Sequence, residues 1–318
     1  MNDGVHSVVL MSREAVERVV FASAPEQAAL LRNLWAKHQH HFSLVDDRAG
    51  ITLDAGAFGI VRFTHRTMLQ FWLLSFASWK AFKAFSAALL LTRMGTGRIN
   101  FSAAAWAGAP GQAEAEEEYA RAIGDVRRLA EIARVEDFTW PDGVPRPQPE
   151  LHFGSVIEEA AFQICAIATG FAFLHEAHHV TLTSCSTESL SPADEELECD
   201  KFARDTLLDS VGRYSAQTGY DLGAVLEKRA LGAALNAYFV LVLTPKERWA
   251  ESASHPPVAR RFRQLCDALE AVPSDANFWL FLTSMLVAHL NLEKLLPQEV
   301  EADHFKSLCY ALFDHLIL

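Results

Sequence analysis

Four prolines between residues 141 and 149 place the strongest single constraint on how this chain of 318 residues can fold. Proline fixes its own φ angle and has no backbone N–H, so the run Trp140-Pro-Asp-Gly-Val-Pro-Arg-Pro-Gln-Pro149 can continue neither a helix nor a central strand. We expect an extended connector at residues 141–150. It would divide the chain into an N-terminal region, residues 1–140, and a C-terminal region, residues 151–318.

The N-terminal region combines helical and strand patterns. Amphipathic spacing predicts helix over the first forty residues, with a second start at Ala24-Pro25-Glu26. The period then changes, and three short β-branched or aromatic segments predict a small three-stranded β-meander. These segments are residues 42–45, 50–53 and 58–63, followed by a predicted helix at 68–91, a polar to acidic loop at 103–118 and a helix that ends at Ile132.

The C-terminal region is predicted to be almost entirely helical. Ser155 with Glu158 forms a capping-box pattern that opens a helix ending near Thr183. Ser191 and Pro192 open the next helix, because Ser is favoured at the N-cap and Pro at the first helical position. The fold class is therefore expected to be mainly α with a small β part (α+β). Further helices are expected at residues 220–244, 257–271, 276–294 and 298–316.

Charge and cysteine content disfavour several classes of protein. The formal net charge of −12 argues against nucleic-acid binding, since phosphate contacts need clustered Lys and Arg. Five scattered cysteines indicate reduced thiols rather than a disulfide scaffold. The charged first thirty residues do not resemble a signal peptide, and the apolar windows are interrupted or too short for a membrane span. We expect a cytoplasmic protein, and the oligomeric state stays open.

The motif His175-Glu176-Ala177-His178-His179 lies near the end of the long capped helix. His175 and His179 are four residues apart, so both imidazoles leave one face of the helix and can bind one metal ion. Glu176 lies beside the open coordination position, where a general base for the zinc-bound water must sit. A motif this short also arises by chance, and the alternative is a helix whose histidines are solvated or satisfied in the core.

A second pair of acidic residues follows on a separately capped helix. Glu196 and Asp200 share a face, so Glu196 could be the third metal ligand and Asp200 could orient a ligating imidazole through its distal N–H. Glu198 is the main competitor, but it lies about 200° around the helix from Glu196. A similar sequence, Glu299-Val-Glu-Ala-Asp303, comes several helices later and is a weaker candidate. The alternative for the whole pair is a solvated acidic face.

A third segment, Ser254-His255-Pro256-Pro257, joins two helices, and its prolines would present His255 from a rigid loop. His255 could donate to the oxyanion of a tetrahedral intermediate or cap the metal in a resting state. Arg261 could pair with the carboxylates behind the zinc. A plain helix start with a surface His and a surface Arg is the alternative.

Other polar and thiol side chains are weaker candidates. His178 points away from the ligand face and is expected to pack or hydrogen-bond. Cys185 and Cys199 form no CxxC pair, and Cys199 is expected to be a small buried apolar residue. His40 and His41 are expected on the solvated surface.

Together the three segments resemble the gluzincin peptidases, whose pattern is HExxH on one helix and ExxxD on the next. The run His255-Pro-Pro-x3-Arg261 resembles the downstream motif of the M48-type members. The resemblance covers the C-terminal third to half of the chain and implies a zincin-like helical catalytic domain at residues 151–318 with one Zn²⁺ ion. M48-type enzymes are commonly membrane-embedded, and the N-terminal half of this chain differs from theirs.

That N-terminal half, with its strand region at residues 54–63 running into a Trp-rich helix, is more similar to the Lit-type phage-exclusion peptidases. These are bacterial cytosolic HExxH proteins that cleave a translation factor. The resemblance implies an intracellular protein substrate and a role in antiviral defence.

The resulting hypothesis is a zinc-dependent endopeptidase that hydrolyses peptide bonds with a metal-activated water. Its catalytic residues would be Glu176 and His255. Two rivals remain: a catalytically inactive zinc-binding interaction or sensor protein with a peptidase-like site, and an all-α scaffold without metal. The sequence does not define the substrate or the bond that is cut.

Overall fold

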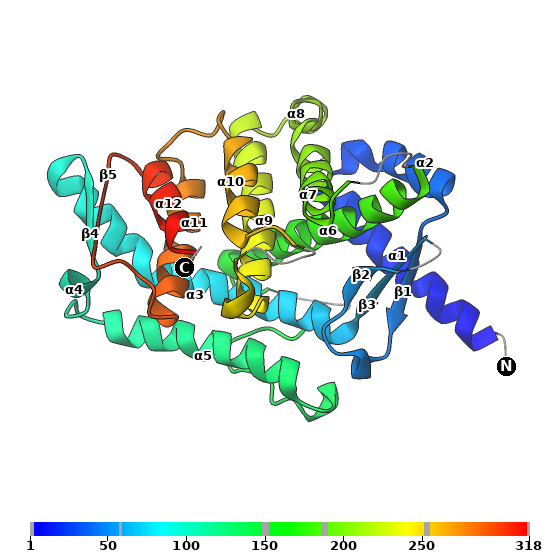
Figure 1. Ribbon diagram of the computed structural model, residues 1–318, viewed down its shortest axis with the longest axis horizontal. Helices are drawn as coiled ribbons and strands as arrows, with labels where there is room; N and C mark the ends of the chain where they lie inside the picture. Colours follow the sequence, from blue (N-terminus) through cyan, green and yellow to red (C-terminus); the bar gives the residue numbers. More distant parts are fainter. Residues whose placement is uncertain (1–2, 57–58, 148–152, 186–189, 251–254, 317–318) are drawn as a thin grey trace.

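The computed structural model describes residues 3–56, 59–147, 153–185, 190–250 and 255–316, and it confirms the mainly α fold (Figure 1). Most helices begin and end close to the predicted residues, and the N-cap predictions at Ser191 and at the segment after Ala24 correspond to observed helix starts. The α-helices are α1 Asp3–Ser23, α2 Ala28–His38, α3 His65–Thr96, α4 Ala103–Trp106, α5 Gln112–Glu131, α6 Val156–Cys185, α7 Pro192–Leu208, α8 Val211–Thr218, α9 Leu222–Leu243, α10 Val258–Asp267, α11 Asn277–Leu292 and α12 Phe305–Phe313.

A three-stranded sheet forms in the N-terminal region, but the prediction of a meander is wrong. The strands are β1 His41–Val45, β2 Leu53–Ala55 and β3 Ile60–Thr64. Their order is β1-β3-β2, with β1 parallel and β2 antiparallel to β3. The connection between β1 and β2 includes a 3₁₀ turn over Asp47–Ala49, which gives it the length to carry the chain past the position of β3. As a result β2 lies at an edge of the sheet.

The sheet packs on α6 through aromatic side chains. Phe42 of β1 and Phe63 of β3 both meet Phe173 of α6 edge to face, with ring centroids 6.1 and 5.2 Å apart. Such pairs contribute beyond the area that they bury. The contact fixes the helix that carries the HExxH motif against the sheet.

Two further predictions of local structure are wrong. Residues 103–118 contain α4 and most of the first half of α5 rather than a loop. Glu114 and Glu117 are exposed, and the inner side of α5 buries Tyr119, Ile123, Val126 and Leu129 at helical spacing. The predicted helix at 298–316 begins only at Phe305.

The segment before α12 is a strand, β5 Glu299–Ala302, which pairs antiparallel with β4 Ile99–Ser102. About two hundred residues separate the two strands, so this sheet depends on a contact that local sequence patterns do not encode. Helix α3 runs from the three-stranded sheet at one end of the molecule to this second sheet at the other (Figure 1).

Helix α6 lies at the centre of the structure and contacts α1, α3, α7 and α9. Over Val156–Ser184 it is long and apolar enough, by length and composition, to cross a membrane, which differs from the expectation that the apolar stretches are too short or interrupted for a span. Half of its most apolar 18-residue window is buried by neighbouring elements. A helix at the centre of a packed core meets the same criterion.

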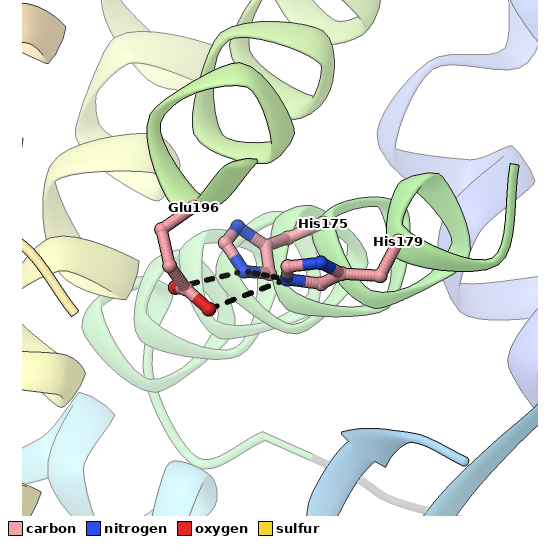
Figure 2. Close-up of side chains that lie close together, drawn as sticks. All are labelled: His175, His179 and Glu196. Atoms are coloured by element: carbon pink, nitrogen blue, oxygen red, sulfur yellow. Dashed lines mark hydrogen bonds and ion pairs between the residues drawn. The ribbon is translucent and has the colours of Figure 1, made fainter. Parts of the chain in front are cut away.

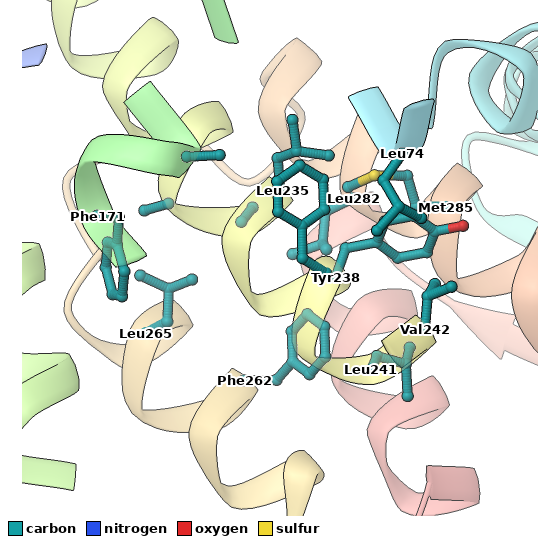
Figure 3. Packing of buried hydrophobic residues seen from close by; sticks show 14 of the residues in the cluster. Leu74, Phe171, Leu235, Tyr238, Leu241, Val242, Phe262, Leu265, Leu282 and Met285 are labelled. Carbon is teal, nitrogen blue, oxygen red and sulfur yellow. The ribbon is translucent and has the colours of Figure 1, made fainter. Parts of the chain in front are cut away.

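The core unites both regions of the chain. Figure 3 shows Leu74 of α3 beside Tyr238 of α9 and Met285 of α11, with Phe262 of α10 nearby. Side chains from before and after the proline run therefore belong to one hydrophobic cluster. The domain boundary at 141–150 stays a prediction, and residues 148–150 lie outside the described part of the chain.

Candidate metal centre

His175 and His179 project from one face of α6, as their spacing predicts, and their rings meet (Figure 2). The two Nε2 atoms are 3.2 Å apart. His175 is 6% exposed, so the pair sits at the floor of the site rather than on its surface.

Glu196 of α7 completes the group. One of its carboxylate oxygens lies 3.5 Å from Nε2 of His175, and the other lies 3.4 Å from Nε2 of His179. These are the separations expected around a tetrahedral zinc ion, because bonds of about 2.0–2.2 Å place neighbouring ligand atoms roughly 3.3–3.6 Å apart. Among the described residues, His175, His179 and Glu196 form the one group of three donors compact enough to hold a metal ion.

The start of α7 is set by its first turn, and its direction is seen from its contacts with α6. Ser191 caps the helix by accepting the backbone N–H of Asp194, and Pro192 occupies the first helical position. Asp200 meets His175, and Glu195 meets His179. Residues later in α7 thus lie opposite residues earlier in α6, so the two helices run antiparallel.

Both imidazoles are held through their outer nitrogens. Nδ1 of His175 donates to Asp200 over 2.8 Å, and Nδ1 of His179 donates to Glu195 over 2.7 Å. An ionised carboxylate only accepts hydrogen bonds, so each Nδ1 carries a proton and a neutral ring leaves its Nε2 lone pair free. Two lone pairs and a carboxylate then converge on one point. Such an arrangement is stable only around a cation, which is either a proton or a metal ion.

The pKa shifts express the same concentration of negative charge. Burial acts to lower the pKa of His175 and of His179, but hydrogen bonds to Asp200, Glu195 and Glu196 outweigh it and raise the two pKa values to about 10 and about 9. Burial acts to raise the pKa of Glu196, but the two imidazoles and Arg261 hold it well below its usual range. The donor set therefore favours positive charge at its centre.

Arg261 of α10 supports the site from behind. Its Nε and Nη2 atoms donate to the two oxygens of Asp200, both over 2.6 Å, and its Nη1 lies 3.5 Å from Glu196. Burial acts to raise the pKa of Asp200, but the guanidinium and His175 lower it to about 2. Asp200 is therefore ionised at neutral pH and can accept from both partners.

Glu176 lies beside the group and is partly buried. One carboxylate oxygen accepts the backbone N–H of Ala55, on β2, over 2.8 Å. Burial raises its pKa, against the opposing effect of the nearby imidazoles. A carboxylate with a raised pKa next to an open metal position suits a group that takes up and releases a proton.

Two cavities meet at this point. The larger, about 720 Å³, is lined by polar groups that include Glu195, Thr183 and His38. The smaller, about 300 Å³, is mainly apolar, with Phe71, Phe239 and Val240 in its wall. Both are bordered by Leu53, Glu176, Glu196 and His255.

His255 stands at the rim, with its side chain 59% exposed and its Nε2 3.7 Å from Glu196. The sequence placed it on a loop before α10, and the structure brings it to the site from there, although Ser254 lies outside the described residues. This position is compatible with both of the roles predicted for it, toward an oxyanion and toward the metal.

The competing residues lie elsewhere. Asp303, from the second ExxxD-like segment at residues 299–303, pairs with Arg98 at the second sheet. His178 stacks on Phe202 with ring centroids 4.2 Å apart, and burial lowers its pKa to about 4, so its predicted packing role holds. Cys199 is fully buried, and burial raises its pKa.

Sequence reasoning missed three contributions to the site. Glu195 was not singled out, although the antiparallel run of α7 along α6 would have suggested an acid four or five residues before Asp200 as the partner of His179. His40 is buried rather than solvated, and its Nε2 donates to the backbone carbonyl of Ala177 over 2.7 Å. The N–H of Ala55 has no side-chain signal, so no motif could have shown it.

Comparisons with known proteins give one match. A family model described as Peptidase U49 matches residues 61–282, more than two thirds of the chain, including α6, α7 and α10. Neither the curated proteins nor the solved structures contain a significant match.

Proposed function

The chain belongs to the peptidase U49 family, and on that premise we propose that it is a zinc-dependent endopeptidase whose metal is held by His175, His179 and Glu196. One observation carries the proposal: two imidazole lone pairs and a carboxylate converge at the separations of a tetrahedral zinc site. Three protein ligands leave a fourth position for water, which is typical of catalytic zinc rather than structural zinc.

A zinc ion bound there would act as a Lewis acid and would make its water acidic enough to be deprotonated near neutral pH. Glu176 takes that proton as the water oxygen attacks the carbonyl carbon of the peptide bond. The C–N bond then breaks, and Glu176 returns the proton to the leaving nitrogen. His255, at the rim, donates a hydrogen bond to the oxygen that becomes negatively charged.

Asp200, Glu195 and Arg261 do not touch the substrate in this proposal. Asp200 and Glu195 fix the orientation of the two imidazoles, and Arg261 keeps Asp200 ionised. The two cavities that meet at Glu176 allow a polypeptide to extend to either side of the cut bond, as internal cleavage requires.

The substrate that we propose is an intracellular protein, cut in the cytoplasm, with a role in antiviral defence. This part of the proposal rests on the resemblance to the Lit-type peptidases. A comparison of protein fragments in phage-infected cells that express either the wild type or Glu176→Gln would test it. Fragments that appear only with the wild type support it, and identical fragment sets contradict it.

The metal assignment is tested by elemental analysis of purified protein. His175→Ala and Glu196→Gln should lose zinc, whereas Glu198→Gln, the same change two residues along α7, should retain it. Zinc retained by His175→Ala and Glu196→Gln, or lost equally from Glu198→Gln, would contradict the assignment.

The catalytic assignment is tested by hydrolysis of a fluorogenic peptide library. Glu176→Gln should keep zinc but lose turnover, and phenanthroline should stop the wild type. A zinc-loaded wild type without hydrolysis on peptides or on cellular proteins would instead favour the inactive sensor.

A further inference from the structure

The backbone N–H of Ala55 points out of the sheet edge toward the site. On one side of it Thr52 accepts the N–H of Thr64, and on the other Gly56 donates to Ile60, so these residues face β3. Backbone groups alternate in direction along a strand, and the Ala55 N–H therefore points away from β3. Because β2 is an edge strand, no other strand among the described residues pairs with it on that side.

That N–H is bonded to Glu176. It donates to one carboxylate oxygen over 2.8 Å and joins a strand of the N-terminal region to the HExxH helix. A carboxylate has two oxygens, so anchoring one leaves the other available to the cavities that Glu176 borders. The anchor also removes rotamer freedom from a side chain that would otherwise sample several positions.

We propose that the Ala55 N–H positions the Glu176 carboxylate for proton transfer. Ala55 would thus be a positioning residue that acts only through Glu176. The inference rests on the proposed function, because it requires Glu176 to be the general base.

A purely structural role is the main alternative. Other contacts already hold α6 to this side of the molecule, namely those of Phe173 with Phe42 and Phe63, and the hydrogen bond from His40 to the Ala177 carbonyl. Removing one hydrogen bond at the edge of β2 should therefore change the position of Glu176 more than the packing of α6. A role in binding the substrate backbone is the second alternative.

The test removes this N–H and leaves the side chains of the site intact. Ala55→Pro deletes it, and proline is tolerated on an edge strand where the N–H faces away from the ladder. Replacing Ala55 by lactic acid deletes the N–H and keeps the methyl group, so it serves if the proline variant does not fold. Ala55→Gly keeps the N–H and is the matched control. Each protein is loaded with zinc and assayed on the best fluorogenic peptide of the wild type.

We expect kcat to fall about tenfold to a hundredfold, the range for loss of a hydrogen bond to a charged group, with KM changed less than about twofold. Zinc content should stay at the wild-type level, and Ala55→Gly should lose less than about threefold in kcat. On the residual hydrolysis of a Glu176→Gln background, measured at high enzyme concentration, the same deletion should have no further effect, because two residues that act through one group are not additive.

Several results would overturn the inference. An unchanged kcat would show that the N–H does not position the base, and a raised KM at unchanged kcat would assign it to substrate binding. A further loss in the Glu176→Gln background would assign it to general structure. Full activity of Glu176→Gln alone would instead refute the proposed function, so the two failures are distinguishable.

Discussion

Replacing Asp200 by Asn tests whether the groups behind the ligands set the affinity of the site. Asp200 accepts from Nδ1 of His175 and from two guanidinium nitrogens of Arg261. Asn has the same shape but offers one acceptor oxygen and no charge. Its NH₂ group must then face either the imidazole N–H or the guanidinium, which sets two donors against each other.

The size of the effect follows from these contacts. Loss of a carboxylate that orients a metal-binding His weakens metal affinity by about 10–100-fold, or about 1.4–2.7 kcal/mol. In the metal-free protein, the shift in the pKa of Asp200 from 3.8 to about 2 corresponds to about 2–3 kcal/mol of stabilisation of the ionised form. We therefore expect Asp200→Asn to lose about 2–3 kcal/mol of stability without metal.

Two assays separate these effects. Competition against a chelating dye measures zinc affinity, and urea unfolding of the metal-free protein measures stability. The matched control is Asp205→Asn, on the same helix. Asp205 accepts from Arg204 and from Lys201 but makes none of the described contacts with the site. The changes in zinc-binding free energy and in unfolding free energy of Asp205→Asn should each stay below about 1 kcal/mol.

The zinc affinity and the stability of Asp200→Asn are compared with those of Asp205→Asn. If Asp200→Asn binds zinc as tightly as Asp205→Asn, then Asp200 does not orient His175 in the way that the hydrogen bond indicates. If both variants lose stability equally, the buried contacts of Asp200 stabilise the metal-free protein no more than the exposed contacts of Asp205 do.

Two further predictions concern packing and pH. Burial lowers the pKa of His289 to about 4, below its value of about 6.5 in the unfolded chain. Between these two pH values the unfolded state binds a proton that the folded state does not. The free energy of unfolding should therefore fall by up to about 3 kcal/mol as the pH drops from about 6.5 to 4. His289→Asn should lose that part of the pH dependence in urea unfolding at pH 7 and pH 4.5, and an unchanged difference between the two pH values would contradict the assignment. Gly232→Ala should destabilise the protein by about 1–3 kcal/mol, because the new Cβ would overlap Ile167 where α9 crosses α6. Gly124→Ala, in α5 with open space around the new Cβ, should instead stabilise the protein by about 0.5–1 kcal/mol. If urea unfolding shows equal effects at both glycines, α6 and α9 do not pack closely at Gly232.

The helices and the group of candidate metal ligands could be predicted from sequence because both depend on short spacings. The i, i+4 relation of His175 and His179 fixes them to one face whatever surrounds the helix. The cap at Ser191 is likewise a local hydrogen bond, so the start of α7 is visible in four residues. The few Ser- and Thr-rich residues between the two predicted helices in the sequence allowed Glu196 to be proposed as their partner.

Elements that depend on distant partners escaped prediction. Strand β5 exists because Val300 and Ala302 pair with Phe101 and Ile99, and alone the segment resembles the start of a helix. In the order β1-β3-β2, strand β3 lies between the two strands that precede it in the sequence. The residue patterns of single strands do not reveal this arrangement.

The mainly α fold and the candidate metal ligands could be read from the sequence alone, because helix periodicity and ligand spacing act over one or two turns. The groups around these candidate ligands became visible only in the folded structure: Glu195 behind His179, Arg261 on Asp200, and the Ala55 N–H on Glu176. The physical reason is that each of these hydrogen bonds joins elements whose relative position is set by packing of the whole core. A backbone N–H in particular is chemically the same at almost every residue, so only the fold selects the one that faces the site.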